Sequence, residues 1–360
     1  MLSPQEEIRY SRQLLLPQIG RAGQEKLAGA KVLVIGAGGL GCPVLQYLAA
    51  AGVGTIAIVD GDTIEESNLQ RQVLYTNNDI GRGKAVVAQE KIQAANPHIH
   101  VQAHSFAVTP ANILELMPPY DIIVDGTDNF AARYLINDAC VLLNKPWVFG
   151  SIFRFEGQVS VFNHAGGPTY RCIFPLPPGE EESPNCSVIG VLSSLPGIVG
   201  TLQATETIKL ITGAGEPLSG RLLVIDSLGM DMQVLHVSAV ESSKNIRALQ
   251  ASYEDVCETA TTLISYTELQ QLKAEEIALI DVREPSEHHL FNIGGVNIPL
   301  GQLEAEYAGL NNSKNIVVYC ASGIRSNRAA VLLAKKGARV SSLRDGIKSL
   351  PGYRWPETGH

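Results

Sequence analysis

Two groups of residues in this 360-residue chain have the types and spacing that chemistry requires. The first is Gly36, Gly38 and Gly41, which form G-x-G-x-x-G between an apolar run and a helix-like run. Glycines at this spacing let the backbone approach a phosphate and present helix N-terminal N–H groups to it. The second is Cys320, which four residues separate from Arg325. The chain thus combines a candidate phosphate site with a candidate reactive thiol.

The residues after the glycine pattern distinguish two kinds of nucleotide chemistry. On its own the pattern also fits a nicotinamide-dependent oxidoreductase, because Asp60 ends the next apolar run, where an acid would bind ribose hydroxyls. Asn68, Arg71, Gln72 and Lys84 then add two cations and two amides, for which hydride transfer has no use. Preorganised Arg and Lys stabilise the charge that grows when a carboxylate attacks an α-phosphate. The set favours ATP-dependent activation of a carboxylate, although a single Lys or Arg is more often a solvated surface charge.

The elements that must position these residues alternate between strands and helices. KVLVI, TIAIVD, DIIVD and PWVFGSI have the composition of buried strands, with helix-like runs between them. This alternation predicts a parallel sheet with its ligand site at the carboxyl ends of the strands. Asp60, Asp125 and Asp128 fall at such ends. Asp128 suits a Mg²⁺ ligand, because Mg²⁺ prefers one or two carboxylates together with phosphate oxygens.

A resemblance to a known family covers about residues 4–235. It rests on the segments RYSRQ, GAGGLGCP, AGVGTIAIVDGDTIEESNLQRQ, GRGKA, DGTDN and FEGQVSVF. Together they resemble the ubiquitin-activating-enzyme-like family of molybdopterin-synthase and thiamine-pathway adenylyltransferases. The resemblance implies that ATP and Mg²⁺ bind here, with Gly39 and Gly41 at the phosphates, Asp60 at the ribose, Asn68, Arg71 and Lys84 at the triphosphate, and Asp128 at the Mg²⁺.

The same resemblance implies partners. Arg12, the second arginine of RYSRQ, matches a residue that reaches the nucleotide of the partner subunit, which implies a homodimer. The substrate would be a ubiquitin-like β-grasp sulfur-carrier protein ending in Gly-Gly, whose carboxylate becomes an acyl adenylate.

Many members of this family hold a structural zinc with two C-x-x-C pairs, and this chain departs from that pattern. The first pair runs from Thr169 to Cys172, and the second from Glu254 to Cys257. Two thiolates remain where four would close a tetrahedral site. We therefore expect no tightly bound structural zinc.

Cys320 lies in VYCASGIRS, at the end of a predicted strand and before a turn-forming loop. The N–H groups of such a loop, Arg325 and the next helix N-terminus should lower the pKa of the thiol and favour a thiolate or persulfide. The ring from Cys320 to Arg325 is tighter than that of cysteine-dependent phosphatases, so sulfur transfer is favoured over phosphatase chemistry. With IDVREPSEHHLFNIGGVNIPL and RDGIKSLPGYRW, the region resembles rhodanese sulfurtransferases over about residues 263–356, where Asp281 and Arg283 would brace the fold. The alternative is a buried, inert Cys320.

Cys186 lies in PLPPGEEESPNCS, a Pro- and Glu-rich stretch that predicts an exposed loop. Related adenylyltransferases carry a cysteine there that bonds to the carrier, and a spectator thiol is the alternative. Our hypothesis is that a Cys320 persulfide, supplied by a cysteine desulfurase or by thiosulfate, attacks the acyl adenylate. Cys186 would then release the thiocarboxylate. A protein that ligates a ubiquitin-like tag through a Cys186 thioester would share the adenylation site, but the Cys320 region argues against it.

We therefore predict an α/β protein of two domains. A Rossmann-like, doubly wound adenylating domain would occupy residues 1–240, and a smaller α/β rhodanese-like domain would occupy 263–360. The linker between them is placed at 241–262, where the sequence is polar and lacks a sustained core pattern.

The composition excludes several other classes of protein. The net charge of −8 and the lack of a basic run argue against nucleic acid or an anionic membrane as the main partner. No apolar run reaches the roughly 20 residues that span a bilayer. The N-terminus has acidic residues where a signal peptide would need a basic start, so we expect a cytoplasmic protein whose scattered cysteines are thiols.

Overall fold

The computed structural model describes residues 2–175, 190–253, 262–273, 277–306, 315–321, 323–344, 346–348, 350 and 353. The chain forms two compact units, Met1–Tyr253 and Glu254–His360, and each has its own sheet. The predicted α/β class is confirmed in both.

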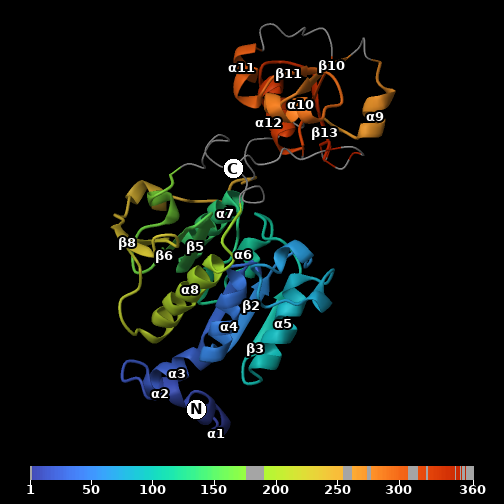
Figure 1. Ribbon diagram of the computed structural model, residues 1–360. Helices are drawn as coiled ribbons and strands as arrows, with labels where there is room; N and C mark the ends of the chain where they lie inside the picture. The colour runs from blue at the N-terminus through green and yellow to red at the C-terminus, as the bar shows by residue number, and fades with distance from the viewer. Residues whose placement is uncertain are drawn as a thin grey trace. The chain divides into compact units, whose positions relative to one another are not determined.

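The first unit is built on an eight-stranded mixed sheet in the order β3-β2-β1-β4-β5-β6-β7-β8 (Figure 1). The strands from β3 to β5 in this order are parallel, as predicted, whereas β6, β7 and β8 add an antiparallel extension. The strands are β1 (Lys31–Ile35), β2 (Thr55–Val59), β3 (His100–His104), β4 (Ile122–Asp125), β5 (Trp147–Phe153), β6 (Glu156–Phe162), β7 (Arg221–Asp226) and β8 (Asp231–His236).

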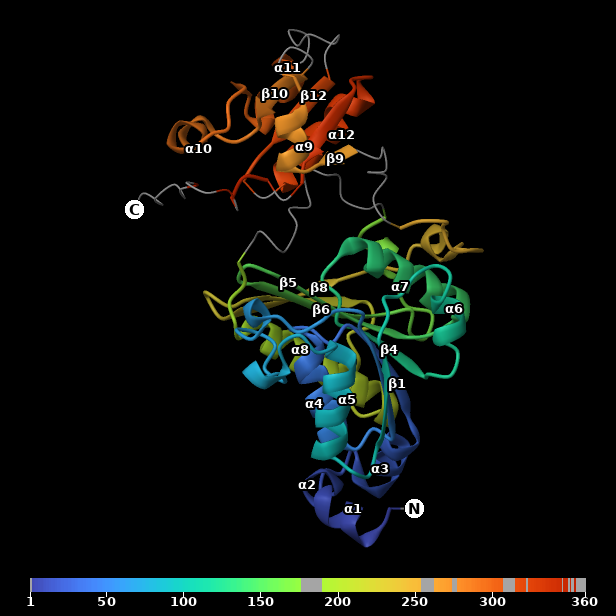
Figure 2. The same ribbon diagram turned by 90° about the vertical axis from the view of Figure 1, so that its right-hand side faces the viewer.

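Helices cover both faces of this sheet: α4, α5 and α8 lie on one face, and α6 and α7 on the other (Figure 2). The α-helices of the unit are α1 (Pro4–Arg9), α2 (Ser11–Leu14), α3 (Gly20–Gly29), α4 (Gly41–Ala51), α5 (Lys84–Ala95), α6 (Ile113–Leu116), α7 (Phe130–Leu143) and α8 (Leu195–Thr212). Short 3₁₀ turns are η1 (Glu66–Asn68), η2 (Asn77–Asp79), η3 (Tyr170–Cys172) and η4 (Glu241–Lys244).

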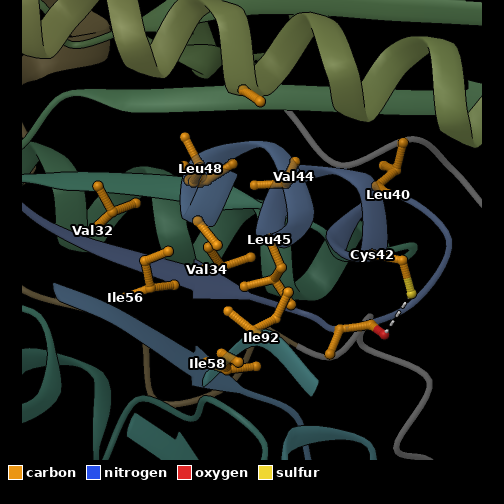
Figure 3. Packing of buried hydrophobic residues seen from close by; sticks show 14 of the residues in the cluster. Val32, Val34, Leu40, Cys42, Val44, Leu45, Leu48, Ile56, Ile58 and Ile92 are labelled. Carbon is orange, nitrogen blue, oxygen red and sulfur yellow. Dashed lines mark hydrogen bonds between the residues drawn. The ribbon is translucent and has the colours of Figure 1, made fainter. Parts of the chain in front are cut away.

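The strand β1 shows why the sequence KVLVI forms the centre of the sheet. Val32 and Val34 pack into the core beneath α4, which Figure 3 shows, whereas Leu33 and Ile35 pack into the core on the opposite face. Successive side chains of a strand point to opposite faces, so a strand covered on both sides needs apolar residues at every position. All four side chains are buried.

The second unit contains a five-stranded sheet in the order β11-β10-β12-β13-β9, and all of its pairings are parallel. Cys320 directly follows its central strand. Its elements are β9 (Thr262–Ile264), α9 (Tyr266–Gln271), β10 (Ile277–Asp281), α10 (Pro285–Leu290), β11 (Val296–Asn297), η5 (Leu300–Gln302), α11 (Leu303–Glu306), β12 (Asn315–Tyr319), α12 (Ile324–Lys335) and β13 (Val340–Leu343).

The segment predicted as a linker at 241–262 differs from the structure in its first half. Leu249 and Tyr253 pack against the core on the α7 face, and the Tyr253 hydroxyl donates to Asp138 Oδ2 at 2.7 Å. Two apolar anchors therefore hold this polar stretch on the first unit, and a scan for periodic core patterns does not detect so few contacts.

Over the part of the chain that the structure describes, none of the helices has the length and apolar character of a membrane span.

Candidate functional site

The glycine loop joins β1 to α4 and lies against the end of β4. Gly36 has a positive φ of 95°, and a Cβ added there would lie 2.6 Å from the backbone of Gly126. A Cβ at Gly41 would lie 2.1 Å from the Gly36 carbonyl oxygen. Both positions therefore require glycine. At Gly38 and Gly39 an added Cβ would meet only side chains, so these two leave backbone open to a ligand.

Asp60 directly follows β2 and holds the glycine loop in place. Its Oδ2 accepts a hydrogen bond from the Ala37 N–H, and its Oδ1 accepts one from the Asp62 N–H, both at 2.8 Å. Burial raises the pKa of Asp60 above its usual value, although these bonds oppose the rise. A carboxylate has about four acceptor positions, so lone pairs remain for ribose hydroxyls.

The predicted cation Lys84 is the first residue of α5 and is buried. Its Nζ pairs with Asp62 Oδ2 at 2.8 Å, while the Asp62 side chain is 75% exposed. The sequence pattern indicated Lys84 but not its partner Asp62. Asp62 lies only two residues after Asp60, and this acidic pair was the available signal.

Asn68, Arg71 and Gln72 lie together on and just after the η1 turn, beside the glycine loop. The N–H groups of Arg71 and Gln72 both donate to the Asn68 carbonyl. The Arg71 Cγ lies 3.7 Å from the Cβ position at Gly39, and the Gln72 amide nitrogen lies 3.5 Å from that at Gly38. Arg71 Nη1 donates to the Ser67 carbonyl at 3.1 Å. The structure thus places Arg71 and Gln72 beside the glycine loop, whereas the hydrogen bonds of the Asn68 side chain are to Glu65 and Ser67.

Asp128 projects from the loop that follows β4, and its side chain is exposed. Both ends of this loop are fixed. Asp125 Oδ1 accepts from the Thr127 N–H and hydroxyl at 2.8 and 2.6 Å, and the Asn129 side chain caps α7. An exposed carboxylate on a fixed loop at a strand end is a suitable oxygen donor for Mg²⁺.

The buried side of this loop contains a charged pair that the sequence analysis missed. Asp125 Oδ2 lies 3.9 Å from Arg133 Nε, and among the described residues neither atom has a hydrogen-bond partner. Burial raises the pKa of Asp125 to about 6, and the Arg133 charge only partly offsets it. This ion pair is therefore loose.

Arg12 is exposed on α2 and lies away from the glycine loop of its own chain. The neighbouring Gln13 donates to the carbonyl of Ala51, the last residue of α4. The glycine loop is at the other end of this 11-residue helix, about 16 Å away. Within one chain, Arg12 therefore lies at the end of α4 that is opposite to the glycine loop.

In the second unit, Cys320 is fully buried at the carboxyl end of β12. Its Sγ accepts a hydrogen bond from the Gly323 N–H at 3.2 Å, and Gly323 has a positive φ of 89°. The loop closes against Gly346, where an added Cβ would lie 2.5 Å from the Cys320 carbonyl. The predicted N–H donation to the sulfur is present at this residue.

Arg325 lies on the first turn of α12, and its guanidinium pairs with a carboxylate. Its Nη1 and Nη2 contact Glu287 Oε2 and Oε1 at 2.6 and 2.7 Å, which makes a bidentate ion pair. This pair raises the pKa of Arg325, and the nearby Cys320 adds to the rise. Burial alone would raise the pKa of Glu287, but Arg325 outweighs it and lowers that pKa. This role of Glu287 was not predicted from the segment EPSE, in which the residue lies.

Asp281 and Arg283 form the buried brace that the sequence predicted. Their side chains meet at 2.6 Å, and Arg283 also donates to the Phe291 carbonyl. His288 Nδ1 lies 2.8 Å from Asp281 Oδ2. Burial alone would raise the pKa of Asp281, but the hydrogen bonds from Arg283 and His288 outweigh it and lower that pKa.

The remaining predicted residues concern the zinc and the second cysteine. Cys172 Sγ accepts hydrogen bonds from the N–H groups of Thr169 and Val240, both at 3.3 Å. Thr169 is buried and lies where the family pattern has its first cysteine. Cys186, Glu254 and Cys257 lie outside the described residues. Within the described ranges, no group of three potential metal-binding side chains occurs.

The two sites together define an enzyme that joins an adenylyltransferase to a sulfurtransferase. The chain belongs to the ThiF family, whose model matches residues 10–246, and a rhodanese-like domain matches residues 265–350. Membership of this family implies the use of ATP.

Of three known proteins that resemble the chain, one does so over both parts and two do so over about two thirds of it. The probable adenylyltransferase/sulfurtransferase MoeZ of Mycobacterium tuberculosis is 45% identical over 93% of this chain and 90% of its own. The sulfur carrier protein adenylyltransferase of Thermus thermophilus is 53% identical over 64% of this chain and 86% of its own. A crystal structure of E. coli MccB superposes with a TM-score of 0.60 and 26% identity, over 68% of this chain and 74% of that one.

Proposed function

We propose that the enzyme adenylates the C-terminal Gly-Gly carboxylate of a ubiquitin-like sulfur-carrier protein and then converts it to a thiocarboxylate. The observation that carries the first step is the gathering of Asp60, Arg71, Gln72 and Lys84 around the glycine loop. The second step rests on Cys320 at a strand end. The similarity to a sulfur carrier protein adenylyltransferase supports this choice of substrate.

In the adenylation step, the glycine loop and the N-terminus of α4 receive the phosphates, and Asp60 binds the ribose. Arg71 and Lys84 stabilise the charge on the α-phosphate and on the departing pyrophosphate. Lys84 leaves Asp62 for a phosphate oxygen, because the exposed Asp62 carboxylate is readily solvated. Asn68 and Gln72 donate amide hydrogen bonds to the phosphates. The carrier carboxylate attacks the α-phosphorus, and pyrophosphate leaves.

Asp128 is the residue proposed to hold Mg²⁺. A bound Mg²⁺ neutralises the phosphate oxygens and so favours departure of pyrophosphate. The exposed carboxylate fits this role because its loop is fixed by Asp125 and Asn129.

In the sulfur step, a cysteine desulfurase or thiosulfate supplies the outer sulfur of a Cys320 persulfide. This persulfide attacks the acyl adenylate, a C–S bond forms, and AMP leaves. Cys186 then attacks the Cys320 sulfur of the acyl disulfide, which releases the carrier thiocarboxylate and leaves a Cys186–Cys320 disulfide. A thiol reductant must reopen this disulfide before the next turnover.

The protein is proposed to act as a homodimer in which Arg12 reaches the nucleotide of the second copy. The position of Arg12 at the far end of α4 supports this proposal, because the side chain is remote from its own glycine loop. A mixture of Arg12→Ala and Lys84→Ala chains tests it. Mixed dimers with one intact site should regain pyrophosphate exchange, and an inactive mixture would contradict the proposal.

No tightly bound structural zinc is proposed for this chain. Thr169 and Glu254 stand where two of the four zinc-binding thiolates would be, so only two thiolates remain. Metal analysis of chelator-washed protein is the test, and one zinc per chain would contradict the proposal.

One assay tests the main function against its alternatives. A Gly-Gly carrier is incubated with the enzyme, ATP, Mg²⁺ and a sulfur donor, and its intact mass is measured. Replacement of one carboxylate oxygen by sulfur is expected, together with pyrophosphate release. Ligation of the carrier to other proteins would instead support tag transfer through Cys186, and cofactor reduction without pyrophosphate would support an oxidoreductase.

A further inference from the structure

The cation of the sulfur site is neutralised by a fixed carboxylate. Arg325 and Glu287 are joined by two short contacts, at 2.6 and 2.7 Å. Bidentate pairs of this kind are among the stronger polar interactions in proteins. Glu287 Oε2 also accepts a hydrogen bond from the Glu284 N–H at 3.1 Å. The carboxylate is therefore held by its own helix, independently of Arg325.

Burial strengthens the effect of this pairing. The side chain of Glu287 is 16% exposed and that of Arg325 is 35% exposed. Because two opposite charges lie next to each other in this pair, their electric fields largely cancel at the distance of a bound ligand. An anion that approaches Cys320 therefore meets an arginine whose charge is already paired with Glu287 and which has two of its five N–H donors bound to that carboxylate.

The consequence depends on the charge of the sulfur donor. Thiosulfate carries two negative charges, so it would be attracted most by a free arginine and disfavoured most by a neighbouring carboxylate. A donor with one negative charge or none would lose much less binding energy from the presence of this carboxylate. A carboxylate fixed beside the arginine would therefore discriminate donors by their charge, before any contact specific to one of them.

We propose that Glu287 is a specificity-determining residue of the sulfur site, which disfavours doubly charged sulfur donors by holding Arg325. This inference rests on the proposed sulfur transfer by Cys320 and names the class of donor that the site accepts. The preferred donors carry at most one negative charge near the transferred sulfur.

The reaction used for the test is a balanced two-step transfer. The Cys320 thiolate attacks the outer sulfur of the donor, the donor S–S bond breaks, and the leaving group departs with the electron pair. Sulfite leaves from thiosulfate, and benzenesulfinate leaves from the singly charged benzenethiosulfonate. Cyanide then takes the outer sulfur of the persulfide as thiocyanate, which restores the thiolate.

The test is steady-state formation of thiocyanate by the full-length chain with each donor in turn. In Glu287→Gln, the KM for thiosulfate should fall roughly tenfold and that for benzenethiosulfonate roughly threefold, because one nearby negative charge is lost. The kcat values should change little. A role limited to supporting the fold would instead affect both donors equally.

Glu284→Gln is the matched control, because it removes one negative charge from the exposed N-cap of the same helix. It should leave both KM values unchanged. Arg325→Gln gives an independent check: with Glu287 unpaired, the KM for thiosulfate should rise more than that for benzenethiosulfonate.

Several results would overturn the inference. An unchanged thiosulfate KM in Glu287→Gln, or an equal change for both donors, would refute the role of Glu287 while leaving sulfur transfer intact. If the unaltered enzyme formed no thiocyanate from either donor, the proposed sulfur transfer itself would fail, and this inference with it.

Discussion

The two units each bury an aspartate–arginine pair next to a candidate site, and the two pairs differ in tightness. Asp281 and Arg283 meet at 2.6 Å with several further hydrogen bonds, whereas Asp125 and Arg133 come no closer than 3.9 Å. The hydrogen bonds lower the pKa of Asp281, but burial raises that of Asp125 to about 6. A buried charge is stabilised only where geometry supplies enough partners.

The same contrast extends to the cations of the two sites. In the sulfur site, Arg325 is clamped by a carboxylate that its own helix fixes. In the nucleotide site, Lys84 has a single contact with the largely exposed Asp62. The first unit thus keeps charges that a polyanionic ligand can engage, whereas the second holds its charges together around the thiol.

The first way to break this comparison is to remove the central residue of each site. Lys84→Ala should lower carrier-dependent pyrophosphate exchange by about 10²- to 10³-fold, because a preorganised charge at the reacting phosphate is lost. Cys320→Ala should abolish thiocarboxylate formation, because it removes the attacking sulfur. Pyrophosphate exchange and intact-mass measurement of the carrier report the two effects.

Each variant is the control for the other. Lys84→Ala should still form a persulfide with a sulfur donor, and Cys320→Ala should still exchange pyrophosphate. If Cys320→Ala still gave full thiocarboxylation with thiosulfate as donor, the proposed sulfur route would be wrong.

A second prediction concerns the backbone of the nucleotide site. Gly41→Ala should weaken ATP binding by at least about tenfold, because its Cβ would overlap the Gly36 carbonyl and displace the loop. Gly83→Ala is the matched control, since nothing lies within 4 Å of a Cβ there. Titration with ATP measures both. Equal affinities for the two variants would show that the loop does not hold the nucleotide.

The sequence alone could predict the elements and residues that depend on local patterns. The strands β1, β2 and β4 and the positions of Asp60 and Asp128 followed from local patterns, because runs of apolar residues determine buried strands. Asp62, Arg133 and Glu287 were missed because their roles depend on tertiary contacts. Glu287 and Arg325 are 38 residues apart in the chain, and no periodicity joins them.

The third prediction compares the two buried aspartates. Asp281→Asn should destabilise the second unit by about 3 kcal/mol at neutral pH, because it leaves Arg283 buried without its counter-ion. Asp125→Asn should cost the first unit at most about 1 kcal/mol, because burial already disfavours the charged form of Asp125 and its contact with Arg133 is loose. Hydrogen exchange of peptides from each unit measures the two separately.

The pH dependence sharpens this comparison, because the two shifts have opposite signs. The folded protein binds a proton at Asp125 more tightly than the unfolded chain does. The contribution of Asp125 to the stability of the folded protein therefore falls as the pH rises from about 4 to about 6. Asp281 has a lowered pKa, so its contribution is present above pH 4 and is lost on further acidification. As the pH falls, the free energy of unfolding of the unaltered protein should rise relative to that of Asp125→Asn. It should fall relative to that of Asp281→Asn. Parallel trends would contradict this assignment.

The smallest effect is expected from the contact of Lys84 with the largely exposed Asp62. Asp62→Asn should lower the KM for ATP by about two- to fivefold, because an ion pair whose carboxylate is largely exposed contributes at most about 1 kcal/mol and the freed ammonium then binds phosphate. Glu90→Gln is the control, since it removes an exposed carboxylate that pairs with Arg82 near the same helix, while Asp79 stays 3.8 Å from Arg82. Pyrophosphate exchange at varied ATP is the measurement. A raised KM in Asp62→Asn would mean that the Asp62 carboxylate itself contributes to binding of the nucleotide and its metal, and Asp62 would then join Asp128 as a candidate Mg²⁺ ligand.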